Sequence, residues 1–155
     1  MIYPRPRRAT LDDLDVLVHH RVAMYTEIGK PRDASFDAMA RNTRDWIGSR
    51  LAAGTFHAYV VAAPDSGEIV AGSGLYLADW PPTHRDPGTV RGIIFNVYVE
   101  PEHRRRGLGR AVTEACIAAA RARGIRVITL NASDAGRPMY ERLGFTGTSE
   151  MRLQF

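Results

Sequence analysis

Cysteine is nearly absent from this sequence, which contains only Cys116. A single thiol excludes a disulfide framework or a thiolate metal cluster built within one chain. Cys116 lies among alanines and an isoleucine, so we expect a small buried side chain and not a nucleophile. The five histidines show no spacing typical of metal ligands, and we expect no metal site.

Long apolar runs are also absent. No stretch reaches the roughly 18 uninterrupted apolar residues of a membrane span. The first ten residues contain no apolar segment of the kind that directs secretion. We therefore expect a soluble, cytoplasmic protein that has no membrane partner.

The length and the charge set broad limits on organisation and partners. A chain of 155 residues with 45% apolar content suffices for one core, and we expect a single domain over residues 1–155. The formal net charge of +4 favours anionic partners, a class that includes nucleic acids, acidic membrane surfaces and phosphorylated cofactors. Charge alone does not choose among them.

Hydrophobic periodicity and turn residues predict a mixed α/β protein. Thr10 and Ser35 are the candidate N-caps of two helices that end near Gly29 and Gly54. Strands are expected at 6–10, at 55–63 and 68–80 as a hairpin, at 92–99, at 125–132 and finally, as one strand or two, at 145–155. Further helices are expected at 108–123 and 133–144. This order predicts a central mixed β-sheet flanked by helices.

The stretch RRRGLGR, residues 104–110, follows a buried strand and opens a long helix. The first N–H groups of a helix have no intrahelical partner and the helix dipole favours an anion there, so this is a good place to bind phosphate. Gly107 and Gly109 allow a bulky pyrophosphate to approach the backbone, and the arginines add charge. Two familiar phosphate loops are excluded: G-x-x-x-x-G-K-[ST] is absent, and GLGRAV lacks the third glycine of G-x-G-x-x-G.

A different signature does match. V-x-P is present as Val99-Glu100-Pro101, and R-x-x-G-x-G follows as residues 104–109. Downstream come a strand with Asn131, a helix with Tyr140 and then Leu143-Gly144-Phe145. In these motifs and their order the sequence resembles the GNAT superfamily of N-acetyltransferases over nearly its whole length. The resemblance implies a single-domain GNAT-like fold whose central strands splay apart to bind acetyl-CoA, and acetyl transfer to a primary amine by direct attack in a ternary complex.

The resemblance also implies roles for individual residues. The pyrophosphate would be held mainly by backbone amides of the loop and helix start, with Arg104 bracing the loop; the set is Arg104, Arg105, Arg106, Gly107, Leu108, Gly109 and Arg110. The pantetheine arm would pair with the backbone of the segment Val97, Tyr98 and Val99, and would also contact Asn131 and Ser133. Tyr140 would contact the cofactor and protonate the departing CoA thiolate. The alternative for Tyr140 is a tyrosine that only packs against the cofactor.

The general base is where the sequence departs from the resemblance. Several members place a glutamate near the positions held here by Ile93 and Ile94, so a water relay or a carboxylate from another element must serve instead. Glu27 and Glu150 are candidates at the acceptor mouth, although a solvated surface carboxylate is the better explanation for each. Arg21 is a candidate for holding an acidic group of the acceptor, or else it lies along the core edge. Asn96 is either an acceptor-binding residue or a satisfied core amide.

Three functions compete on this sequence. The leading hypothesis is an N-acetyltransferase that uses acetyl-CoA and a small-molecule or peptide amine. The second is a CoA-binding sensor of the same fold, which the missing strand glutamate supports. The third, a nucleic-acid binder, would interleave aromatics with the arginines, and HRRRGLGR has none, so no nucleic-acid partner is expected. A homodimer is compatible with the sequence, which offers no specific support for one.

Overall fold

The computed structural model describes residues 2–29 and 33–155. Its five strands form one sheet in the order β1-β2-β3-β4-β5, antiparallel except for the parallel pair β4 and β5. The strands are β1 (Arg7–Arg8), β2 (Phe56–Ala62), β3 (Ile69–Asp79), β4 (Val90–Val99) and β5 (Ile128–Leu130). The mixed sheet and the hairpin of β2 and β3 are as predicted.

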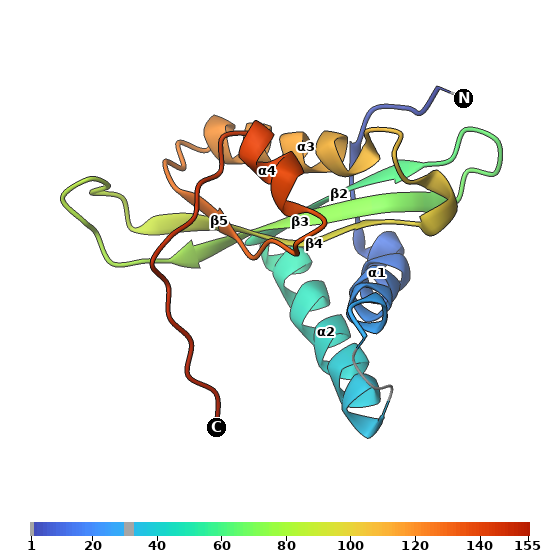
Figure 1. The fold of residues 1–155 in the computed structure, drawn as a ribbon, viewed down its shortest axis with the longest axis horizontal. Coiled ribbons are helices and arrows are strands. Elements are labelled where there is room, and N and C mark those ends of the chain that lie inside the picture. The colour runs from blue at the N-terminus through green and yellow to red at the C-terminus, as the bar shows by residue number, and fades with distance from the viewer. Residues whose placement is uncertain (1, 30–32) are drawn as a thin grey trace.

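Helices cover both faces of the sheet. They are η1 (Leu11–Asp13), α1 (Leu14–Glu27), α2 (Ala34–Ala53), η2 (Pro101–His103), α3 (Leu108–Ala122) and α4 (Arg137–Arg142). Figure 1 shows α3 and α4 on one face, and α1 and α2 on the other. None of the helices in the described ranges is long and apolar enough to cross a membrane.

The helix starts follow the expected capping chemistry with one correction. Thr10 forms a reciprocal capping box with Asp13 at the start of η1, which leads directly into α1. The N-cap of α2 is Asp33 and not Ser35, because the Asp33 carboxylate accepts a hydrogen bond from the Ser35 amide at 2.8 Å. Both residue types can cap a helix. Because α2 begins at Ala34, the residue in the N-cap position is Asp33.

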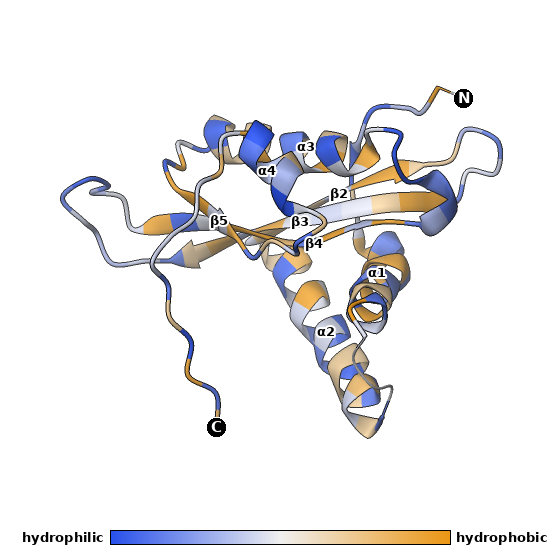
Figure 2. Cartoon of the chain, viewed as in Figure 1, coloured by the Kyte–Doolittle hydropathy of each residue, from blue (hydrophilic) through white to orange (hydrophobic). Residues whose placement is uncertain are grey.

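The core lies on both sides of the sheet, and Figure 2 shows apolar residues along its strands. Below the sheet, Leu17 and Ile47 pack against Phe56. Above it, one side of α3 is fully buried at Val112 and Cys116. Burial raises the pKa of the Cys116 thiol to about 12, so the side chain is an inert part of the core, as expected.

The predicted final strand at 145–155 is wrong for this chain. Phe145 packs into the cluster around β5, but residues 146–155 are exposed and form neither helix nor strand. A strand requires a neighbour that pairs with its backbone, and this segment leaves the body of the protein without meeting one (Figure 1).

Candidate active site

The strands β4 and β5 pair over only three residues and then separate. Their ladder ends at Ile94 opposite Leu130. A bulge follows on β4, where Asn96 has a left-handed backbone with φ of 55° and the register with β3 shifts between Gly72 and Gly74. A bulge bends its strand and interrupts pairing. From Phe95 to Val99, β4 therefore has no backbone pairing with β5.

The loop after β4 presents backbone N–H groups at the start of α3. Arg105 and Gly107 are both left-handed, with φ of 59° and 80°. The first α3 hydrogen bond runs from the Ala111 N–H to the Gly107 carbonyl at 3.0 Å, so the amides of Leu108 to Arg110 are not used by the helix. This arrangement is suited to an anion such as a pyrophosphate.

Arg104 ties the loop to two other elements. Its Nε donates to the Val99 carbonyl at 2.9 Å, and its Nη2 lies 2.6 and 2.7 Å from the two carboxylate oxygens of Glu27 at the end of α1. Tyr98 also donates to Glu27, at 2.8 Å. Burial opposes the charge on Glu27, but the hydrogen bonds from Arg104 and Tyr98 outweigh it and hold the pKa of Glu27 below its usual value.

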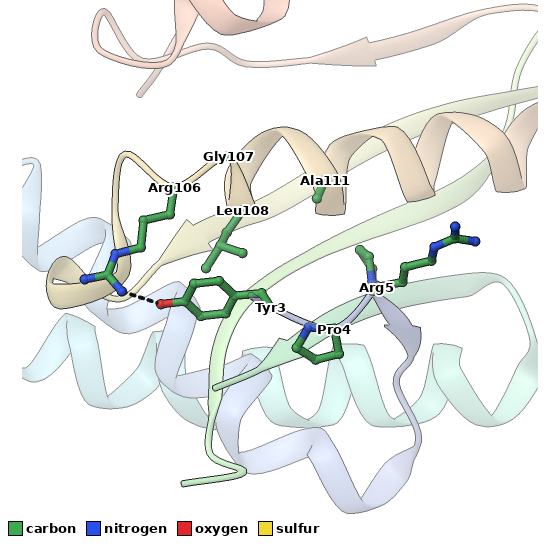
Figure 3. A pocket seen from close by; sticks show the side chains of 8 residues that line it. Tyr3, Pro4, Arg5, Arg106, Gly107, Leu108 and Ala111 are labelled. Atoms are coloured by element: carbon green, nitrogen blue, oxygen red, sulfur yellow. Dashed lines mark hydrogen bonds between the residues drawn. The ribbon is translucent and has the colours of Figure 1, made fainter. Parts of the chain in front are cut away.

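Tyr3, near the N-terminus, contacts the same loop, and the sequence did not indicate this contact. The Tyr3 hydroxyl lies 2.7 Å from His103 Nδ1 and accepts a hydrogen bond from Arg106 at 2.9 Å. Figure 3 shows Arg106 reaching to this hydroxyl beside Leu108. A cavity of about 700 Å³ lies here, lined by Tyr3, Pro4, Arg5, Pro6, Arg106, Gly107, Leu108 and Ala111.

Tyr140 lies on α4, close to the start of α3. A Cβ placed on Gly109 would be 3.7 Å from Met139 Sδ, which shows how closely α4 approaches that turn. The Tyr140 side chain is buried, with its ring 6.0 Å from that of Phe145. Burial raises the pKa of Tyr140 to about 12, so its hydroxyl stays protonated at neutral pH.

Asn131 and Ser133 follow the carboxyl end of β5, on the far side of the opening from β4. Both residues are exposed. Ser133 organises the turn into α4, since its carbonyl accepts from Arg137 N–H at 2.9 Å and its Oγ accepts from Gly136 N–H at 3.2 Å. The structure therefore places both residues where the two strands diverge.

The four residues considered for the acceptor are not brought together as one group. Arg21 and Asn96 do meet, with Arg21 Nη1 donating to the buried Asn96 Oδ1 at 2.8 Å and the guanidinium 5.3 Å from the centre of the Tyr25 ring. Glu27 is held by Arg104 instead. Glu150 is exposed in the C-terminal segment, residues 146–155.

No group of three or more histidines, cysteines or carboxylates that could hold a metal ion occurs within residues 2–29 and 33–155. The buried His20 is a separate feature. Burial and, to a smaller extent, the neighbouring His19 lower the pKa of His20 to about 4. Its 3.8 Å approach to Glu100 is therefore no ion pair at neutral pH, because the ring is uncharged.

Comparison of the sequence with models of protein families identifies the family of this chain. The model of the acetyltransferase (GNAT) family matches residues 17–145, which include β4, the loop that contains residues 104–107, α3 and Tyr140. The chain belongs to the GNAT family. Tyr3 and Glu150 lie outside the matched region.

Solved GNAT structures share the fold over nearly the whole chain. A GCN5-related N-acetyltransferase from Ralstonia eutropha is 37% identical, with a TM-score of 0.90 and 97% of each chain covered. A protein from Clostridium acetobutylicum described as a predicted acetyltransferase, solved with acetyl-CoA, is 26% identical, with a TM-score of 0.85 and coverage of 99% of this chain and 96% of that one.

Curated relatives are more varied. A mycothiol acetyltransferase from Propionibacterium freudenreichii is 31% identical over 144 residues, covering 89% of this chain and 41% of that protein. An L-methionine sulfoximine/L-methionine sulfone acetyltransferase from Pseudomonas aeruginosa is 33% identical over 115 residues, covering 71% of this chain and 62% of that protein. The chain thus spans about two to three fifths of the length of these relatives.

Proposed function

We propose that this chain transfers an acetyl group from acetyl-CoA to a primary amine by direct attack within a ternary complex. The observation that carries the proposal is the opening between β4 and β5, which leads to free amides at the start of α3. CoA has amide groups along its pantetheine arm and a pyrophosphate at the far end. An unpaired strand edge followed by an anion site matches that order of groups.

The residues that would hold the cosubstrate fall into three sets. The amides of residues 105–110 would bind the pyrophosphate, with Arg105 and Arg110 adding charge. The backbone of Val97 and Val99 would pair with the pantetheine amides from one side, and Asn131 and Ser133 would contact it from the other. Tyr98 would contribute only backbone, because its side chain is turned toward α1 and hydrogen-bonded to Glu27.

Acetyl-CoA supplies an activated thioester to this site. The amine nitrogen forms the new C–N bond and loses a proton, while the C–S bond breaks and the sulfur gains a proton. A backbone N–H on the open edge of β4 would donate to the carbonyl oxygen as it becomes negative. Tyr140, protonated at neutral pH, would donate the proton to the sulfur.

The acceptor would enter from the face of the sheet that carries α1 and α2. Arg21 and Asn96 lie on that face, directly beside the bulge in β4. Arg21 forms no ion pair with a described carboxylate, which leaves its charge for an acidic group on the acceptor. We assign removal of the amine proton to water in the opening, since Ile93 and Ile94 are apolar and Glu27 is engaged by Arg104.

An acceptor screen tests the proposal. The protein is incubated with acetyl-CoA and a panel of small amines, amino acids, aminoglycosides and peptides, and both thiol release and acetylated products are measured. The proposal predicts amine-dependent thiol release with a product heavier by one acetyl group. Saturable CoA binding without turnover on any amine would indicate a binding module, and salt-sensitive DNA binding without CoA binding would indicate a nucleic-acid binder. Either result contradicts the proposal.

A further inference from the structure

The bulge in β4 turns two consecutive side chains toward the same face of the sheet. In a regular strand, neighbouring side chains point to opposite faces. Here Phe95 packs against the apolar cluster that contains Ile47 of α2, and Asn96 meets Arg21 of α1. Both helices lie on one face, and the extra residue of a bulge permits this arrangement. That face therefore carries an apolar and a polar side chain at adjacent positions, where the unpaired edge of β4 begins.

Arg21 is held in place by uncharged partners. Its Nη1 donates to Asn96 Oδ1 at 2.8 Å, and its guanidinium lies 5.3 Å from the centre of the Tyr25 ring. No carboxylate pairs with it within residues 2–29 and 33–155. A guanidinium has five N–H donors, and the bond to Asn96 takes up one of them. Arg21 thus keeps its charge and most of its donors for a ligand.

Asn96 provides another unused donor at the same place. The residue is only 5% exposed, and its Oδ1 is taken by Arg21. Its Nδ2 has no hydrogen-bond partner in the part of the chain that the structure describes, yet this atom is not sealed from solvent. Polar atoms of buried side chains are usually hydrogen-bonded, so an acceptor oxygen on a ligand is favoured here. Arg21 and Asn96 together offer donors to such a group.

Half-buried aromatic rings adjoin these donors. The Trp46 ring on α2 lies 5.0 Å from the Tyr76 ring and 6.0 Å from the Phe95 ring, measured between ring centres. All three side chains are partly exposed. Because Phe95 directly precedes Asn96, the aromatic cluster is continuous with the polar pair. A ligand suited to this face has an acidic group and an apolar part.

We propose that the acceptor is an α-amino acid with an apolar side chain, an inference that rests on the acetyl transfer proposed above. Arg21 and Asn96 bind its carboxylate, and its side chain packs against Trp46 and Phe95. Asn96 both anchors Arg21 and lies on the open edge of β4, so the carboxylate and the reacting amine are a short distance apart in one small molecule. The single charge of Arg21 matches a carboxylate better than a phosphate dianion.

Acceptors with and without the acidic group test this inference. L-phenylalanine and L-phenylalaninamide share the ring and the amine, and only the first has a carboxylate. Amidation also makes the amine less basic, which favours the amide, so a preference for the acid reports on the carboxylate. From the rate of acetylated product, kcat/KM is expected to be at least about tenfold higher for the acid. L-phenylalanine is also expected to exceed glycine, which lacks a side chain.

Two variants connect the preference to Arg21. Arg21→Gln removes the charge. Asn96→Asp places an isosteric carboxylate against Arg21, and aspartate tolerates the left-handed backbone of this position. Both variants are expected to reduce the acid-to-amide ratio of kcat/KM to about one, with thermal unfolding remaining cooperative. The control is Arg121→Gln, which removes an exposed arginine of α3 on the opposite face of the sheet and should keep the ratio.

The outcomes separate this inference from the proposed function. Equal turnover of the acid and the amide overturns the inference, as does a preference that persists in both variants or a preference for glycine. In each of these cases acetylated product still forms, so the acetyl transfer stands. Absence of acetylated product with every amine overturns the proposed function itself, and the inference with it.

Discussion

Arg104 Nη2 lies 2.6 and 2.7 Å from the two carboxylate oxygens of Glu27, joining the first arginine of the phosphate-loop signature to the end of α1. The two residues are 77 positions apart in the sequence. The Arg104 guanidinium is therefore bound within the protein, and its pair with Glu27 holds the loop against the end of α1. Bracing of the loop by Arg104 fits the role that the family resemblance implied.

Loss of this pair is expected to weaken binding of acetyl-CoA without altering the chemical step. Glu27→Gln should raise the KM for acetyl-CoA roughly two- to fivefold with little change in kcat, since an ion pair this exposed is worth up to about 1 kcal/mol. Steady-state kinetics at saturating amine measure both constants. The control is Asp15→Asn, which removes the exposed pair of Asp15 with Arg44, in which no residue of the loop takes part. A fall in kcat at unchanged KM would instead assign Glu27 to the chemistry.

The two glycines of the loop are predicted to differ. Gly107 has φ of 80°, which costs an L-residue about 1 kcal/mol and would shift the amides that follow. Gly109 has an ordinary backbone, and a Cβ there would lie 3.6 Å from Val99 Cγ2, an acceptable contact. Gly107→Ala should therefore weaken CoA binding, measured by calorimetry, more than Gly109→Ala does. Equal losses, or a larger loss in Gly109→Ala, would mean that space and not backbone conformation governs the loop.

His20 is expected to make stability depend on pH. Its pKa in the folded protein is about 4 and its ordinary value is 6.5, so the unfolded chain binds the proton more readily. Stability is complete above about pH 6.5 and falls as pH decreases toward 4, by at most about 3 kcal/mol. Thermal unfolding at pH 7 and pH 4.5 measures the loss.

The matched variant for this prediction is His20→Leu, which removes the titrating ring. Its unfolding temperature should change less between the two pH values than that of the unaltered protein. Both His20 ring nitrogens are buried without a hydrogen-bond partner in the described residues, so an apolar replacement leaves no polar group behind. An identical pH dependence in the two proteins would show that groups other than His20 are responsible.

Local patterns in the sequence predicted much of the fold and selected the residues of the proposed cofactor site. The helix at 108–123 and the apolar strand before it follow from periodicity, and the loop between them from its glycines and arginines. The polar Asn96 in an apolar strand was also visible. Its left-handed backbone and the bulge were not, because they depend on the register between β4 and β3.

Contacts between distant segments escaped prediction. Tyr3 reaches His103 across 100 positions, and nothing in its proline- and arginine-rich surroundings indicates that contact. The C-terminal segment shows a limit of another kind. Met151, Leu153 and Phe155 alternate with polar residues as in a strand, but such a pattern cannot show whether a neighbouring strand is present to pair with it.

Tyr140 offers the most direct test of the account, because the proposed reaction requires its proton. Tyr140→Phe should lower kcat about 100-fold or more while the dissociation constant of CoA is unchanged. The control is Tyr59→Phe, which removes a hydroxyl from another tyrosine in the cluster around β5. Since the pKa of Tyr140 is about 12, its proton stays in place as pH rises from 7 to 10, and no loss of rate in that range should depend on this residue. Unchanged kcat in Tyr140→Phe, with acetylated product still formed, would contradict the assignment of Tyr140 as the acid.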